Sequence, residues 1–127
     1  MEQRLFTPRE ANQRLPLIKK IVEDILDKGK TFRALLENYD GSEEIPDDLE
    51  NAKSEIEDLI YELEELGCQF KDWNFELGLV DFPAVIDGQS VLLCWRSDEP
   101  ELKWYHALEE GYAGRKPIPA ELLQSSL

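Results

Sequence analysis

Two apolar segments separated by Asp87-Gly88 constrain the fold of this chain more than any other feature. An Asp-Gly pair in this position is typical of a two-residue β-hairpin turn, because a type I′ turn needs positive φ at both central residues. So short a turn also fixes the register of the two strands. The predicted pairs are Ile86 with Gln89, Ala84 with Val91, Phe82 with Leu93, and Val80 with Trp95.

Side-chain alternation gives this hairpin two faces of different chemistry. The paired residues form an almost wholly apolar face, which we expect to pack on helices. The opposite face carries Asp81, Pro83, Val85, Ser90, Leu92, Cys94 and Arg96. A bulge at Pro83 would move Asp81 to the other face. Short strands over 68–73 and 102–106 would extend the sheet.

The first half of the chain carries apolar residues in alternating steps of four and three, a heptad pattern typical of helices. One seam runs over residues 11–39, interrupted only by Gly29, and a second runs over 45–66. The segments have similar lengths and a short loop between them, which predicts an antiparallel helical hairpin. Net charges of +2 over residues 8–39 and −10 over residues 43–65 favour this pairing.

Pro16 conflicts with a straight first helix, because proline lacks a backbone N–H and its ring clashes with the carbonyl four residues earlier. The sequence therefore predicts a break or kink there, with a short helix over 8–14 and a long one over 16–39. The expected fold class is α+β: a long antiparallel helical hairpin, its first helix kinked at Pro16, packed on a small antiparallel β-sheet. The 127 residues are expected to form a single domain over 1–127, with the helical hairpin at 8–66, a β-rich half at 68–118 and a loose tail at 119–127.

The acidic composition excludes some partners. A net charge of −14 argues against nucleic acid and anionic membranes, because both repel a polyanion. No apolar run approaches the roughly 18 residues of a membrane span, and the first residues lack the apolar region of a signal peptide. Cys68 and Cys94 have no CxxC spacing, which fits a reducing compartment, and we interpret both as small packing residues. The sequence therefore predicts a cytoplasmic protein.

A polar set in the second half forms a candidate ligand site: Asp81, Arg96, Glu99, His106 and Arg115. A carboxylate within an apolar strand needs a partner, and Arg96 lies diagonally opposite Asp81. This pair has two interpretations, a structural ion pair that clamps the hairpin and a site in which Arg96 binds an anionic group. In an enzymatic version, Asp81 or His106 would accept a proton while the two arginines hold an anion.

His106 is the only histidine, so a site with two histidines from one subunit is excluded. Glu109 and Glu110 follow it by three and four residues and would share a face with it on a helix. Together with Asp81 or Glu99, these side chains offer ligands for a single divalent metal ion. The alternative is that His106 is a hydrogen-bonded core residue beside its aromatic neighbours. No other cofactor is predicted, because nucleotide-binding loops and nucleophile motifs are absent.

Several sequence blocks have an unusual order and spacing. They are Phe6 to Asn12, Leu15-Pro16, Gly78 to Ala84, Asp87-Gly88, Leu93 to Arg96, Glu99-Pro100, Trp104 to His106 and Gly111 to Arg115. In these blocks the chain resembles a bacterial family known as the domain of unknown function 2203 family. The order and spacing of the motifs agree from residue 78 to 118. The helical middle of the chain resembles the family only in its general helical character. The family has no assigned activity, so the resemblance implies a small cytoplasmic bacterial protein and transfers no catalytic residue.

Two functions stay open at this point. The seams carry more apolar positions than one hairpin partner covers, which favours a non-enzymatic protein-interaction module that binds a protein partner or forms a homodimer through its helices. The alternative is a small-ligand or metal-binding domain with its polar site around Asp81, Arg96 and His106. The lack of a standard nucleophile arrangement favours the first function, and whether the protein is an enzyme is left open.

Overall fold

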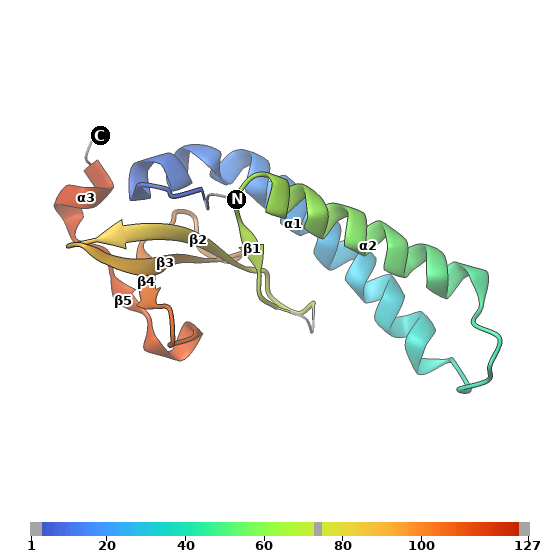
Figure 1. The fold of residues 1–127 in the computed structure, drawn as a ribbon. Helices are drawn as coiled ribbons and strands as arrows, with labels where there is room; N and C mark the ends of the chain where they lie inside the picture. The colour runs from blue at the N-terminus through green and yellow to red at the C-terminus, as the bar shows by residue number, and fades with distance from the viewer. Residues whose placement is uncertain (1–3, 73–74, 125–127) are drawn as a thin grey trace.

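The computed structural model describes residues 4–72 and 75–124, and in this part of the chain two long helices precede a five-stranded antiparallel sheet (Figure 1). The long helices are α1 (Pro8–Glu37) and α2 (Asp47–Glu65). The strands, in their order across the sheet, are β1 (Gln69–Phe70), β2 (Leu79–Ile86), β3 (Gln89–Arg96), β4 (Trp104–Ala107) and β5 (Lys116–Pro117). A 3-10 turn, η1 (Tyr112–Gly114), and a short helix, α3 (Ala120–Gln124), complete the described fold. The predicted α+β class is confirmed.

Helix α1 begins where the sequence predicts and continues without a break through Pro16. Thr7 Oγ1 accepts a hydrogen bond from the Glu10 amide at 3.1 Å, and Glu10 Oε1 accepts one from the Thr7 amide at 2.9 Å, which is a capping box. The predicted division into helices over 8–14 and 16–39 is wrong, because α1 runs through Pro16 as one helix. Figure 1 shows its axis bending as the helix leaves the sheet. The lost hydrogen bond and the proline ring therefore bend the helix without ending it.

The two long helices pack as the predicted antiparallel hairpin (Figure 1). Buried residues of α1 follow the first seam as far as Gly29, and those of α2 follow the second seam from Leu49 to Leu63, except that Ile60 is buried and Leu59 only partly so. The proximal part of the hairpin covers one face of the sheet, and the distal part projects beyond it. The core therefore lies between the sheet, the first half of α1 and the second half of α2, which contributes Ile56, Ile60 and Leu63.

Strands β2 and β3 form the predicted hairpin in the predicted register. Asp87 and Gly88 have φ angles of 52° and 78°, as a type I′ turn requires. Pro83 pairs with Leu92 within a continuous ladder, so no bulge moves Asp81 to the other face. Phe82 is fully buried in the core with the helices, which leaves Asp81 on the face that points away from them.

The outer parts of the β-rich half differ from the predicted ranges. The strand expected over 68–73 is Gln69–Phe70, and Trp73 lies outside the described residues. The strand expected over 102–106 is Trp104–Ala107. The predicted tail over 119–127 includes α3, whose Leu122 and Leu123 pack against the core, and residues 125–127 lie outside the described part of the chain.

The interruption of the first heptad seam at Gly29 has a structural cause. Phe75, which has a φ of 57°, packs directly on this position, and a Cβ at residue 29 would lie 2.5 Å from the Phe75 Cβ. The Phe75 ring also stacks on Phe70, with 6.2 Å between the ring centroids. The glycine therefore lets the segment between β1 and β2 pack against α1.

Candidate functional site

Three buried side chains from three neighbouring strands meet on the face of the sheet that points away from the helices. They are Asp81 on β2, Cys94 on β3 and His106 on β4. Asp81 pairs directly with Cys94, and His106 pairs with Leu92, two residues before Cys94. Because residues two apart on a strand point to the same side, the three side chains share one face. Their carboxylate, thiol and imidazole atoms all lie within 4.8 Å of one another. We call this group the Asp–Cys–His cluster.

His106 is the polar partner of Asp81. Its Nε2 atom lies 3.3 Å from Asp81 Oδ2, and the two side chains are 3% and 4% exposed. Its Nδ1 atom lies 2.8 Å from the Ala107 carbonyl oxygen. A carbonyl oxygen only accepts hydrogen bonds, so Nδ1 carries a proton and donates it. This bond fixes the ring orientation and directs Nε2 toward the cluster.

The predicted pairing of Asp81 with Arg96 is wrong. Arg96 Nε forms a salt bridge of 2.5 Å with Asp98 Oδ1, and its Nη1 donates a hydrogen bond to the Tyr112 hydroxyl. Arg96 lies at the solvent-facing end of β3, where its long side chain reaches the following turn. The buried carboxylate of Asp81 is instead satisfied from the inner part of the sheet by His106.

Glu99 and Arg115 form a second ion pair beside the cluster. Arg115 Nη2 lies 2.7 Å from both carboxylate oxygens of Glu99, and the side chains of Arg115 and Glu99 are 9% and 16% exposed. The guanidinium lies over the rings of Trp104 and Tyr112, 5.0 and 4.8 Å from their centroids. Its Nη2 also donates to the carbonyl oxygen of Cys94 at 3.4 Å. Arg115 therefore ties the η1 segment to the backbone of the cluster.

The five predicted ligand-binding residues thus divide into separate groups. The structure brings Asp81 and His106 together and joins Glu99 to Arg115, while Arg96 pairs with Asp98. Asp81 and His106 line a pocket of 320 Å³, whereas Arg96, Glu99 and Arg115 line a second pocket of 350 Å³, and Tyr112 lines both. Cys94, which we interpreted as a packing residue, is the third member of the cluster that does converge.

The predicted metal set of His106, Glu109 and Glu110 is not brought together by helical spacing. His106 lies on strand β4, and a turn follows it, so the i+3 and i+4 relationship of a helix does not apply. Glu110 Oε1 accepts a hydrogen bond from the Ala107 amide at 3.3 Å, and Glu109 is exposed. Within the described residues, the group with metal-ligand spacing is Asp81, Cys94 and His106.

Burial determines the electrostatics of the cluster. It raises the pKa of the Asp81 carboxyl, although the nearby charges of His106 and Lys71 act in the opposite direction. It also raises the pKa of the Cys94 thiol to about 12, and the Asp81 carboxylate adds to this shift. The pKa of Cys68, buried elsewhere in the protein, is raised to about 12 by burial as well. Both thiols are therefore protonated at neutral pH unless a cation displaces the proton.

The cluster lies at the inner end of a pocket of 320 Å³. The buried members of the pocket wall are Leu92 and the three cluster residues, whereas Lys71 and Tyr112 are exposed at its rim. The rest of the lining is Leu79, Leu108, Glu110 and Gly111. Figure 1 shows the segment with η1 on the side of the sheet opposite α1. Gly111 and Tyr112 of this segment line the pocket.

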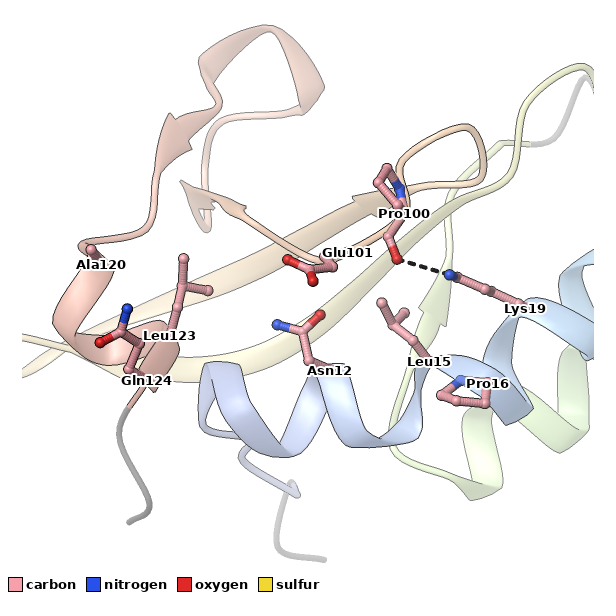
Figure 2. A pocket seen from close by; sticks show the side chains of 9 residues that line it. All are labelled: Asn12, Leu15, Pro16, Lys19, Pro100, Glu101, Ala120, Leu123 and Gln124. Carbon is pink, nitrogen blue, oxygen red and sulfur yellow. Dashed lines mark hydrogen bonds between the residues drawn. The ribbon is translucent and has the colours of Figure 1, made fainter.

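A larger pocket of 480 Å³ lies on the helical side, between the first turns of α1, the segment after β3 and α3 (Figure 2). Its polar groups are used within the fold. Lys19 Nζ donates to the Pro100 carbonyl at 2.8 Å, and the Asn12 side chain bonds both the N–H and the carbonyl of Leu102, at 2.8 and 3.0 Å. These bonds join α1 to the β3–β4 connection, and they indicate a structural role for this region.

Fold and site together define an α+β protein with a buried Asp–Cys–His cluster at the inner end of a pocket. The family model described as "Uncharacterized conserved protein (DUF2203)" matches residues 4–118, so the chain belongs to this family, as the resemblance indicated. The matched range includes every cluster and rim residue named above. Neither the comparison with curated proteins nor that with solved structures finds a match. Within residues 4–72 and 75–124, no helix has the length and apolar character needed to cross a bilayer.

Proposed function

We propose that this protein binds one divalent transition-metal ion through Asp81, Cys94 and His106. The observation that carries this proposal is the convergence of three different metal-ligand types, all buried, within 4.8 Å of one another. In tetrahedral zinc sites, metal–ligand bonds of about 2.0–2.3 Å place neighbouring ligand atoms about 3.3–3.8 Å apart. The cluster therefore needs only small side-chain adjustments to surround such an ion. A mixed set of imidazole, thiolate and carboxylate suits zinc and its neighbours better than magnesium or calcium.

The second support is the hydrogen bond between His106 Nδ1 and the Ala107 carbonyl. Metal-bound histidines usually donate their second ring N–H to a carbonyl or carboxylate, which orients the ligand nitrogen toward the metal. Nε2 then offers a lone pair toward Asp81, and both groups are acceptors unless a proton lies between them. A metal ion in this position takes the place of that proton.

Charge balance also favours a divalent cation. An ionised Asp81, a Cys94 thiolate and a neutral His106 together carry two negative charges, which a divalent ion neutralises within the buried site. The net charge of −14 raises the local concentration of cations around the protein. Because burial raises the pKa of Cys94 to about 12, the ion must displace the thiol proton as it binds. The same protonation argues against Cys94 as a nucleophile on its own.

Three protein ligands leave a fourth coordination position of a tetrahedral site open, and because all three ligands line the pocket, a bound ion would be accessible from it. Sites of this kind bind water or a small molecule at the metal. The proposed function is therefore that of a metal-dependent small-ligand-binding domain, and a bound water at the open position would be the starting point for hydrolytic chemistry.

Cobalt(II) titration of the reduced, metal-free protein tests this proposal, because thiolate-bound cobalt absorbs in the near ultraviolet. We expect one equivalent of Co²⁺ to bind with a thiolate charge-transfer band and tetrahedral visible bands, and Zn²⁺ to displace it. Cys94→Ala should remove the charge-transfer band. Cys68→Ala is the matched control, since Cys68 is also a buried thiol with a pKa of about 12 but lies outside the cluster. Wild-type protein that binds no Co²⁺ or Zn²⁺, or an unchanged band in Cys94→Ala, would overturn the proposal.

The distal half of the helical hairpin supports a second candidate function, the protein-interaction module indicated by the heptad seams. Buried residues of α1 end at Gly29, yet the seam continues to Leu36, which is 48% exposed. Ile45, before α2, is 46% exposed. Sedimentation velocity over a range of concentrations tests self-association through this region. A concentration-dependent dimer that is lost in Leu36→Glu supports it, and a monomer at every concentration contradicts it.

A further inference from the structure

We infer that the pocket over the Asp–Cys–His cluster takes a small monocarboxylate, whose anionic group is held between the bound metal ion and Lys71 while its apolar part lies on the leucines of the pocket. This inference rests on the proposed metal site and adds the chemical class of its ligand. The juxtaposition of a metal-ligand cluster, an available cation and an apolar wall in one pocket of 320 Å³ carries it.

Lys71 supplies the positive charge at the pocket rim. It follows β1 directly, and its backbone N–H donates to the Leu79 carbonyl at 2.7 Å, which holds the residue against the sheet. The Lys71 charge lies close enough to the cluster to act on the Asp81 carboxyl. The salt bridges found among residues 4–72 and 75–124 do not include Lys71. By contrast, the nearby Arg96 and Arg115 are paired with Asp98 and Glu99, so Lys71 is the cation placed to meet an incoming anion.

Tyr112 offers a hydrogen-bond donor at the rim. The Tyr112 hydroxyl oxygen accepts a hydrogen bond from Arg96 Nη1. A phenol has one O–H proton in addition to its acceptor lone pairs, so this arrangement leaves the proton for another acceptor. Lys71 and Tyr112 both line the pocket, so we assign the Lys71 ammonium and the Tyr112 hydroxyl as the donors to the carboxylate.

The remaining wall limits the ligand further. Leu79, Leu92 and Leu108 line the pocket and favour an apolar body behind the anionic group. Glu110 also lines the pocket, and its carboxylate disfavours a second negative charge on the ligand. With a divalent ion the cluster itself is neutral, so Lys71 balances a single anionic group. These constraints select a carboxylate with one charge and a short aliphatic chain.

Anion titrations of the cobalt-loaded protein test the inference, with butyrate, acetate and sulfate as probes. We expect butyrate to shift the visible cobalt bands in a saturable way and to bind more tightly than acetate, because its longer chain reaches the leucines. Lys71→Met should weaken butyrate about tenfold, the loss typical of a charge-assisted hydrogen bond, without changing the cobalt spectrum of the anion-free protein. Lys71→Arg should restore most of the affinity. Lys116→Met is the matched control, because it removes the same charge from an exposed residue of β5 that does not line the pocket.

The outcomes separate this inference from the proposed metal site. If no cobalt binds, the metal site itself is wrong. If cobalt binds with its thiolate band but butyrate leaves the spectrum unchanged, the metal site stands and the carboxylate inference is overturned. Equal butyrate affinity in Lys71→Met and wild type, or sulfate binding as tight as that of butyrate, would overturn it as well.

Discussion

His106 and Asp81 approach within 3.3 Å across an intervening strand, although β4 and β2 are not neighbours in the sheet. Both side chains lean over β3, and Cys94 of that strand completes the group. The constellation therefore depends on two independent strand registers, one between β2 and β3 and one between β3 and β4. A slip of either register would separate the acid from the imidazole.

The buried Asp81 carboxyl makes the stability of the metal-free protein depend on pH. Burial raises the pKa of Asp81 in the folded state, so the folded protein holds this proton more tightly than the unfolded chain does. Its stabilising contribution is complete below the unfolded pKa, about 3.9, and decreases as the pH rises through the folded value. We therefore expect the stability of wild type relative to Asp81→Asn to fall with rising pH.

Denaturant unfolding of both proteins in the presence of a chelator, at a series of pH values from about 4 to 7, measures this difference. Asp87→Asn is a suitable control, since Asp87 is exposed in the turn. Parallel stability curves for wild type and Asp81→Asn would show that Asp81 titrates alike in the folded and unfolded chains.

Gly29→Ala is expected to destabilise the protein by about 1–3 kcal/mol, as overpacking does, because the new Cβ would lie 2.5 Å from Phe75. The sign of the change in unfolding free energy is informative, since replacing glycine by alanine at an unobstructed helix position stabilises a protein by about 1 kcal/mol. Thermal or urea unfolding of Gly29→Ala and wild type shows whether the substitution lowers or raises stability. In a Phe75→Gly background, which removes the Cβ as well as the ring, the same substitution should become stabilising, and a loss of equal size in both backgrounds would exclude Phe75 as the cause.

Glu99→Gln is expected to cost about 3 kcal/mol of stability, because it leaves the buried Arg115 guanidinium without a charged partner. Asp98→Asn, one residue earlier, is the matched control. Its salt bridge to Arg96 is largely exposed, so the expected change is small. Urea unfolding of the two variants compares them directly. Equal losses of unfolding free energy in both variants would show that burial does not make the Glu99–Arg115 pair more important for stability than the Arg96–Asp98 pair.

The sequence was sufficient to predict the β2–β3 hairpin because a two-residue turn leaves one register, and Asp81 opposite Cys94 follows from it. It was not sufficient for β4. Seven residues separate β3 from β4, and a connection of that length does not fix which residue meets which. The sequence therefore does not predict the position of His106 beside Asp81, and it favours Arg96 as the partner instead.

Two other differences have similarly local causes. The predicted metal set of His106, Glu109 and Glu110 rests on a helical period over residues 106–110, where the structure has a strand that ends in a turn. Cys94 carries no motif, and its place on the Asp81 face was visible in the predicted register. That Cys94 belongs to a cluster of metal-ligand residues becomes apparent only when the position of His106 is also known. Pro16 predicts a disturbance of the helix, but whether a helix bends or ends there depends on the packing of its flanking turns.

The projecting helical hairpin has a consequence for how this protein behaves in solution. With 30 residues, α1 alone is about 45 Å long, and much of the distal hairpin lies beyond the sheet (Figure 1). Such an asymmetric particle experiences more hydrodynamic drag than a sphere of the same mass. A single copy will therefore elute from a gel-filtration column ahead of compact standards of 14.7 kDa, and only a mass measured by light scattering can distinguish it from a pair.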